Sequence, residues 1–129
     1  MTPMDPTSQA LGEVLDAETV QQLIDLDDGA LGLIQEMFEI FREDTPSRID
    51  ALAVAAGANH REEIGDIAHA IKGAAATIGA PRVRALALAL ETAGRKGSSD
   101  PEPTILVASL REEFQSALKA LEAFIASKR

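Results

Sequence analysis

The 129-residue sequence contains no cysteine, tryptophan or tyrosine, and only four phenylalanines. The lack of cysteine excludes a disulfide framework, a thiolate metal site and a cysteine nucleophile, and it fits a reducing, cytoplasmic environment. With so few aromatic rings, the chain has no stacking platform for single-stranded bases. The net charge of −9 also disfavours nucleic acid and anionic membrane surfaces, because both attract basic proteins.

Long hydrophobic runs are missing as well. No apolar stretch approaches the roughly 20 residues that a membrane-spanning helix needs, and the opening MTPMDPTSQA lacks the pattern of a signal peptide. Residues 1–13 are polar, contain two prolines and are expected to form a flexible lead-in. The remaining residues 14–127 are rich in alanine and leucine, and at this length we expect them to form one helical domain.

Apolar residues recur at intervals of three and four along five segments, which predicts amphipathic helices and no strands. Asp16 is expected to cap a short first helix that ends near Asp25, before a break at Asp27-Asp28-Gly29. The second segment runs from about residue 31 to residue 57. Thr45-Pro46 interrupts it, and the sequence allows either a new helix at this point or one long helix with a kink.

The third segment is predicted to begin at Asn59 as the cap, with Glu62 completing a capping box, and to end at Gly79. The fourth opens with Pro81 and ends in Arg95-Lys96-Gly97, which is favourable chemistry for a helix C-terminus. The last runs from about residue 104 to near the end of the chain. Together these segments predict an all-α fold, an antiparallel four-helix bundle with an extra short N-terminal helix across one end.

His69 lies in the third helix and is predicted to point towards solvent. At about 100° per residue, it falls opposite an apolar stripe that includes Ile67 and Ile71. Gly65 and Gly73, one turn to either side, are predicted to share its exposed face. A glycine inside a helix costs about 1 kcal/mol relative to alanine, so two of them suggest that a partner must reach the imidazole. An ordinary surface histidine beside two tolerated glycines is the alternative.

An exposed imidazole can act as a nucleophile near neutral pH, but a convex helix supplies no cleft or oxyanion site for a hydrolase. The stretch GAAATIGAP lacks the lysine and hydroxyl residue of a phosphate-binding P-loop. Asp66 and His69 have the spacing of one arm of a carboxylate-bridged metal site, but the second arm is missing. We therefore expect no metal or other cofactor in this chain. Asp66 and Glu62 could either orient the imidazole or remain solvated.

The segment AHAIKGAA (residues 68–75), followed by Ile78-Gly79-Ala80 and by Leu90-Glu91 in the next helix, resembles the signature of histidine-containing phosphotransfer (HPt) domains. The resemblance covers about residues 14–127, with Ile71 at a position where leucine is commoner. It implies a helical bundle that relays phosphoryl groups between the aspartates of receiver domains in multistep two-component signalling.

The resemblance also implies roles for individual residues. His69 would accept the phosphoryl group, Lys72 would offer positive charge to the phosphoryl oxygens, and Gly73 would clear the approach. The surface expected to meet a partner is completed by Glu62, Gly65, Asp66 and Ala76. That partner would be the receiver domain of a response regulator or hybrid histidine kinase, bringing its own aspartate and Mg²⁺. The chain is then expected to be a monomeric phosphocarrier and not an enzyme.

Two other interpretations remain open. One is the histidine-bearing domain of a chemotaxis-type kinase, excised from a longer chain; the initiating Met fits a free-standing protein without excluding this. The other is an interaction or scaffold bundle that is never phosphorylated. A kinase dimerisation domain is disfavoured, because such domains need two chains to build a bundle and this chain has enough helices alone.

Overall fold

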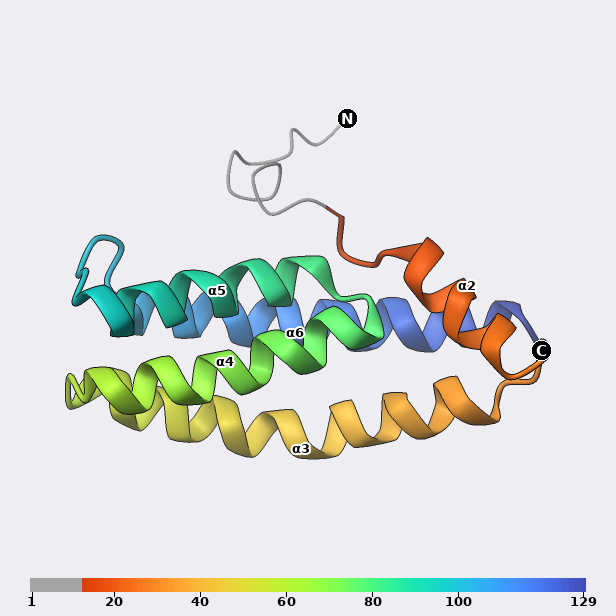
Figure 1. Ribbon diagram of the computed structural model, residues 1–129, viewed down its shortest axis with the longest axis horizontal. Coiled ribbons are helices and arrows are strands. Elements are labelled where there is room, and N and C mark those ends of the chain that lie inside the picture. The colour runs from red at the N-terminus through yellow and green to blue at the C-terminus, as the bar shows by residue number, and fades with distance from the viewer. Residues whose placement is uncertain (1–12) are drawn as a thin grey trace.

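The computed structural model describes residues 13–129, which contain helices but no strands (Figure 1). This confirms the all-α fold class. The lead-in predicted for residues 1–13 lies outside the described residues except for Glu13. The helices are α2 (Ala17–Leu26), α3 (Gly32–Gly57), α4 (Arg61–Ile78), α5 (Pro81–Lys96) and α6 (Pro103–Ser127).

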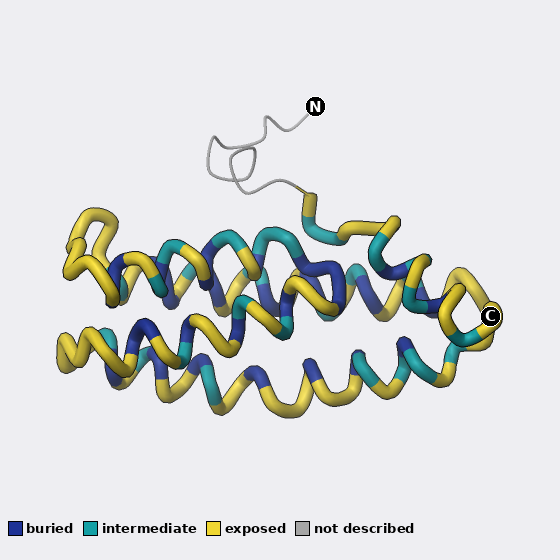
Figure 2. The backbone as a smooth tube through the Cα atoms, in the orientation of Figure 1, coloured by how far each residue is buried: buried dark blue, intermediate teal, exposed yellow. Residues whose placement is uncertain are grey.

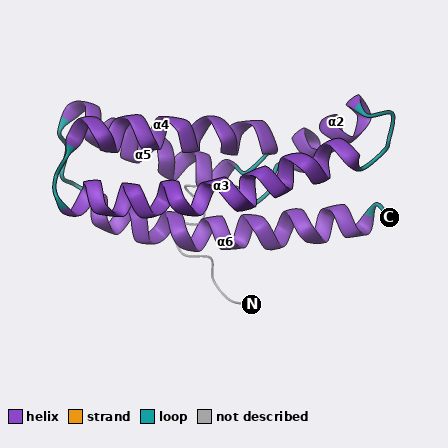
Figure 3. Ribbon diagram, turned by 90° about the horizontal axis from the view of Figure 1, so that it is seen from below, coloured by secondary structure: helices purple, strands orange, loops and turns teal. Residues whose placement is uncertain are grey.

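Helices α3 to α6 form an antiparallel bundle in which each helix packs against two others (Figures 1 and 3). Helix α4 lies between α3 and α5, and α6 closes the ring by packing against both α3 and α5. At one end α3 and α6 extend past the shorter α4 and α5, and α2 lies there against α3 and α4 (Figure 1). The predicted bundle with an extra N-terminal helix is therefore confirmed.

The core lies along the bundle axis, and the buried face of each helix turns towards it (Figure 2). Phe41 of α3 and Phe114 of α6 meet edge to face at its centre, with 5.2 Å between ring centroids, a favoured aromatic geometry. Four apolar residues at intervals of three, one and three along α5 are all buried: Val83, Leu86, Ala87 and Leu90. None of the helices in residues 13–129 combines the length and the apolar character that crossing a membrane requires.

Helix α3 continues through the Thr45-Pro46 step as a single helix of 26 residues. Pro46 has no N–H to donate to the preceding turn, but its ring lies on the exposed side of the helix. Thr45 is only 1% exposed, and Ile49 one turn later is also buried. The apolar face thus passes through the proline without interruption, so one long helix is the correct alternative.

The predicted capping role of Asn59 is wrong. Asn59 has a φ of +56°, a left-handed conformation that asparagine tolerates better than most residues, and it ends α3 instead of starting α4. The His60 N–H donates to the carbonyl of Ala55 at 2.9 Å, as expected when a helix ends in a left-handed residue. His60 is the N-cap of α4 and makes no capping hydrogen bond with its side chain. Glu62 therefore completes no capping box.

The turn between α4 and α5 holds α2 in place. Gly79 has a φ of +82° and ends α4 as predicted, and its carbonyl accepts a hydrogen bond from the Asp16 N–H at 2.9 Å. A Cβ atom on Gly79 would lie 3.2 Å from a methyl group of Val20, so the small residue also permits the close contact with α2. Asp16 caps α2 as predicted, accepting from the Thr19 N–H at 3.3 Å.

Candidate functional site

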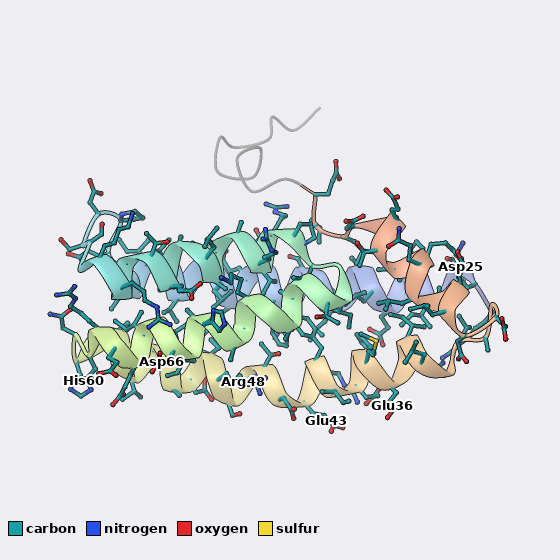
Figure 4. The ribbon with its side chains drawn as sticks, in the orientation of Figure 1. Asp25, Glu36, Glu43, Arg48, His60 and Asp66 are labelled. Carbon is teal, nitrogen blue, oxygen red and sulfur yellow. The ribbon has the colours of Figure 1, made fainter. Side chains whose placement is uncertain are left out.

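His69 projects from the middle of α4 into solvent, with 63% of its side chain exposed. The neighbouring Ala68 and Ile71 are fully buried, so the stripe that faces the core is the one predicted. The second histidine, His60, lies at the turn between α3 and α4, at the far end of the bundle from α2 (Figure 4). Within residues 13–129 its ion pair is with Glu63, at 3.7 Å. Its place at the turn separates it from the site on α4.

Glu91 of α5 holds both His69 and Lys72. One carboxylate oxygen, Oε2, lies 2.8 Å from Nδ1 of His69, and the other, Oε1, accepts a hydrogen bond from Nζ of Lys72 at 2.6 Å. Lys72 follows His69 by three residues, so both side chains leave α4 towards the same part of α5. The Glu91 side chain is only 13% exposed, which places this bridge between the two helices.

The contact with Glu91 determines which ring nitrogen of His69 is free. An ionised carboxylate can only accept hydrogen bonds, so the neutral imidazole carries its proton on Nδ1 and donates it to Glu91. The lone pair of the neutral ring then lies on Nε2. Because most of the ring is exposed, this nitrogen is available to a reacting atom of a partner. The arrangement suits a neutral nucleophile.

The charge state that this geometry requires of Glu91 is also favoured. The hydrogen bond from Lys72 is the largest cause that lowers the pKa of Glu91 below its ordinary value of 4.5. Burial acts in the opposite direction, and the hydrogen bond from His69 lowers the pKa further. Glu91 is therefore a carboxylate at neutral pH, able to accept hydrogen bonds from both partners.

Asp66 contacts a different partner from the one considered in the sequence analysis. Its Oδ1 pairs with Nη1 of Arg95 at 3.1 Å, and the other terminal nitrogen of Arg95 lies 3.7 Å from Oε2 of Glu91. Figure 4 shows Asp66 on the side of α4 that is turned towards the viewer. Glu62 is exposed in the first turn of α4. Glu91 thus orients the imidazole, while Asp66 pairs with Arg95.

The two glycines around His69 differ in environment. Gly73 is exposed, and a Cβ atom placed on it would have no neighbour within 4 Å; Ala76 is exposed too. The prediction that Gly65 faces solvent is wrong, because Gly65 is buried against α5. A Cβ atom on Gly65 would lie 3.1 Å from Nη1 of Arg95. Gly65 lies only about 40° round the helix from His69, but on the flank that α5 covers.

A mostly apolar groove of about 290 Å³ lies between α3 and α4, beginning at Gly73. One of its lining residues is Ile40, which is 53% exposed. The groove and Glu91 flank His69 on opposite sides, since the groove is formed with α3 and the carboxylate comes from α5. The groove is lined by Met37, Ile40, Phe41, Thr45, Arg48, Gly73, Ala74, Thr77 and Ile78.

Neither Glu91 nor Arg95 is given a role in the site from the sequence, although Glu91 lies in a segment that carries the resemblance and Arg95 follows it by one turn of the same helix. The sequence did indicate that Glu91 could contact a neighbouring helix. It directly follows the buried Leu90 and so lies at the edge of the packed face of α5. The sequence does not give the register of α5 against α4, and this register decides which residues of α4 Glu91 can reach. Within residues 13–129 no group of three or more His, Cys, Asp or Glu side chains is arranged to hold a metal ion.

Comparisons with known proteins agree with this architecture. A family model described as "Hpt domain" matches residues 36–124, a range that includes His69, Lys72, Gly73 and Glu91. The structure is similar to the histidine-containing phosphotransfer domain of ArcB from Escherichia coli, with a TM-score of 0.74 and 23% sequence identity over 95% of this chain and 98% of that chain. At this identity the likeness concerns the fold. Comparison with curated proteins gave no match.

Proposed function

This chain belongs to the Hpt domain family, which has a histidine phosphotransfer role in phosphorelays, and on that basis we propose that His69 is its phosphoryl-accepting residue. The observation that carries the proposal is the hydrogen bond of 2.8 Å between Nδ1 of His69 and Glu91. It leaves Nε2 as the free nucleophile on an exposed ring. Among the described residues, the carboxylate that pairs with the other histidine, His60, is that of Glu63 at the longer distance of 3.7 Å.

The reaction is a transfer between two carriers. Nε2 of His69 attacks the phosphorus of an aspartyl phosphate on the partner. The N–P bond forms while the bond from phosphorus to the aspartate oxygen breaks, and the aspartate leaves as a carboxylate. The proton on Nδ1 stays in place, so the imidazole ring gains positive charge. The Glu91 carboxylate is positioned to stabilise that charge, because it already accepts the Nδ1–H hydrogen bond.

Lys72 and Gly73 support the transfer in different ways. Lys72 lies one turn from His69, and its ammonium group can turn from Glu91 to the oxygens of a phosphoryl group on Nε2. Gly73 places bare backbone next to the ring, so that a partner surface can approach closely. Asp66 and Ala76 are exposed around this position and belong to the surface that the partner would cover; Glu62 lies further away, in the first turn of α4.

The partner that fits this site is a receiver domain. Phosphoryl transfer depends on positioning and on neutralising the charge of the phosphoryl oxygens, usually with a metal ion. The receiver domain would supply the aspartate and Mg²⁺, while this chain supplies the nucleophile, Lys72 and Glu91. The apolar groove beside Gly73 would take an apolar side chain of the receiver. In this role the protein is a monomeric phosphocarrier.

The experiment is to charge the protein from a radiolabelled, phosphorylated receiver domain in the presence of Mg²⁺. We expect wild type and His60→Gln to gain acid-labile label, and His69→Gln to gain none. Circular dichroism of both variants controls for folding, since both histidines are exposed. Label that persists in His69→Gln, or that only His60→Gln removes, would show that the site is wrongly assigned. Lack of label on wild type with several receivers would favour a scaffold role.

A further inference from the structure

Helices α4 and α5 touch through their backbones at a pair of glycines. A Cβ atom on Gly94 of α5 would lie 2.7 Å from both the backbone nitrogen of Gly65 and the carbonyl oxygen of Arg61 on α4. Side-chain carbons do not approach backbone atoms this closely, so any other residue at this position would force the two helices apart. Gly94 lies inside α5 without a positive φ. Close approach is therefore the reason for glycine here.

This contact lies next to the site along both helices. Gly65 precedes His69 by one turn of α4, and Gly94 follows Glu91 by three residues of α5. These separations correspond to about 6 Å and 4.5 Å along the respective helix axes. The spacing of the backbones at the glycine pair therefore largely sets the gap that the Glu91 side chain must cross.

The distance between α4 and α5 at the site can change little before the hydrogen bonds of Glu91 are lost. Glu91 spans it with both carboxylate oxygens engaged, at 2.8 Å from His69 and 2.6 Å from Lys72. A hydrogen bond weakens once the two heavy atoms move a few tenths of an ångström beyond this range. If α4 and α5 moved apart, Glu91 could no longer satisfy both partners at once, and the proton on Nδ1 of His69 would lose its fixed acceptor.

Gly65 and Gly94 are not equivalent in this contact. The three atoms nearest to a Cβ atom on Gly65 would all belong to the side chain of Arg95, the nearest being Nη1 at 3.1 Å. Arg95 is half exposed, so its guanidinium can move aside. A Cβ atom on Gly94 would meet backbone atoms of α4, which cannot move without the helix. Alanine at Gly65 thus displaces a side chain, whereas alanine at Gly94 displaces a helix.

We propose that Gly94 is a positioning residue for phosphotransfer: its backbone contact with Gly65 holds α4 and α5 at the separation that lets Glu91 bridge His69 and Lys72. The inference rests on the proposed function of His69 and deepens it. Gly94 does not touch the reacting atoms. It acts through the carboxylate that selects the protonated nitrogen of the imidazole.

The test compares Gly94→Ala with two controls away from the site: Gly57→Ala at the end of α3, where a Cβ atom has no neighbour within 4 Å, and Ile125→Val, a core change in the last turns of α6. The ¹⁵N chemical shifts of His69 report which ring nitrogen carries the proton. The rate of transfer from a phosphorylated receiver, measured at increasing receiver concentration, separates the saturating rate from the apparent affinity. A merely structural role would lower the melting temperature and leave both readouts unchanged in the folded protein.

We expect Gly94→Ala to shift the proton population of His69 away from Nδ1 and to lower the saturating transfer rate by roughly tenfold to a hundredfold, the scale of a displacement near 1 Å. Receiver affinity should stay near the wild-type value. Gly57→Ala and Ile125→Val should keep the wild-type proton position and transfer within about twofold of the wild-type rate, too small a change for a loss of catalytic geometry. A folded Gly94→Ala protein with a wild-type proton position and rate would overturn the proposal.

If Gly94→Ala alone does not fold, the same substitution is tested in a stabilised background. Gly57→Ala lies at the end of α3 with no neighbour near its Cβ, so it offers a background of higher helix stability for Gly94→Ala. Failure to fold in this background as well would assign the glycine contact to the fold alone and overturn the proposal. The proton position is measured without any phosphotransfer, so this result is independent of the His69→Gln labelling experiment.

Discussion

At the scale of single residues, the site depends on one carboxylate that serves two partners. Glu91 accepts hydrogen bonds from His69 and Lys72 with different oxygens. One oxygen orients the imidazole of His69, and the other keeps the ammonium group of Lys72 close to it. Lys72 is paired with Glu91, and in the proposed reaction its ammonium group would turn to the phosphoryl oxygens. The pair has a measurable signature, since the hydrogen bond from Lys72 lowers the pKa of Glu91.

Replacing Lys72 by alanine should raise the pKa of Glu91 towards its ordinary value of 4.5, because the hydrogen bond from Lys72 is the largest cause of its lowering. A lowered pKa in the folded state means that the pair stabilises the fold at neutral pH and that this contribution is lost as pH falls through the lowered value. The ¹³C shift of the Glu91 carboxyl group measures the change.

The same variant should lose only about 1 kcal/mol or less of stability at neutral pH, since the pair is partly exposed. Its phosphohistidine should differ from that of wild type in transfer rate or lifetime. A Glu91 titration that does not move in Lys72→Ala would contradict the assigned cause. An unchanged rate and lifetime would reduce Lys72 to a structural ion pair.

Gly73 should separate stability from function. A Cβ atom at this position has no neighbour within 4 Å, so Gly73→Ala should gain roughly 0.5–1 kcal/mol of stability from helix propensity. Gly73→Gln should also fold, but its longer side chain would fill the space beside His69 and slow transfer. Melting temperature and transfer rate measured on both variants test this. An unfolded Gly73→Gln protein, or one that transfers at the wild-type rate, would contradict it.

At the scale of the elements, the sequence predicts those features that depend on one helix or one turn. The buried stripes of α4 and α5, the Asp16 cap and the end of α4 at Gly79 all follow from local spacing and conformational preference. Asn59 was misassigned because asparagine favours both a cap and a left-handed helix end, and only the path of the chain after α3 decides between them.

The features that sequence reasoning missed depend on how two helices pack. Gly65 was placed in solvent because a helical wheel shows angles and not which flank a neighbour covers. Glu91 was recognised within a resembling segment, but its span to His69 depends on the register of α5 against α4. The separation of the two helices depends in part on Gly94, whose importance is visible only once Gly65 is found opposite it.

The groove between α3 and α4 is predicted to contribute to receiver affinity without affecting the rate of phosphoryl transfer. Ile40 lines this groove and is 53% exposed, so Ile40→Asp should leave the core intact and weaken receiver binding by about tenfold, as loss of a contact worth 1–2 kcal/mol would. Val54→Asp is the control, because Val54 is an exposed residue of the same helix outside the groove.

The measurement is the transfer rate against receiver concentration for both variants. The saturating rate should stay near the wild-type value in each, with a higher half-saturating concentration for Ile40→Asp alone. Equal effects of the two substitutions would indicate general repulsion by added negative charge and would remove the groove from the proposed receiver surface.

At the scale of the whole molecule, residues 13–129 form one helical bundle, and His69 projects from the outside of α4 into solvent. Such an architecture suits a carrier, because a convex site can be covered by another protein. We predict that the purified protein stays unlabelled when incubated with radiolabelled ATP and Mg²⁺, and that a cognate kinase or phosphorylated receiver is required. Steady incorporation at His69 from ATP alone would contradict the carrier role.

The central claim is that Glu91 holds the proton of His69 on Nδ1 and thereby makes Nε2 the nucleophile. The most direct test is to charge ¹⁵N-labelled protein from a phosphorylated receiver and to identify the phosphorylated nitrogen by NMR through its coupling to ³¹P. We predict a phosphoryl group on Nε2 of His69, with the Nδ1 proton still hydrogen-bonded to Glu91. A phosphoryl group on Nδ1, or on any residue other than His69, would contradict the account.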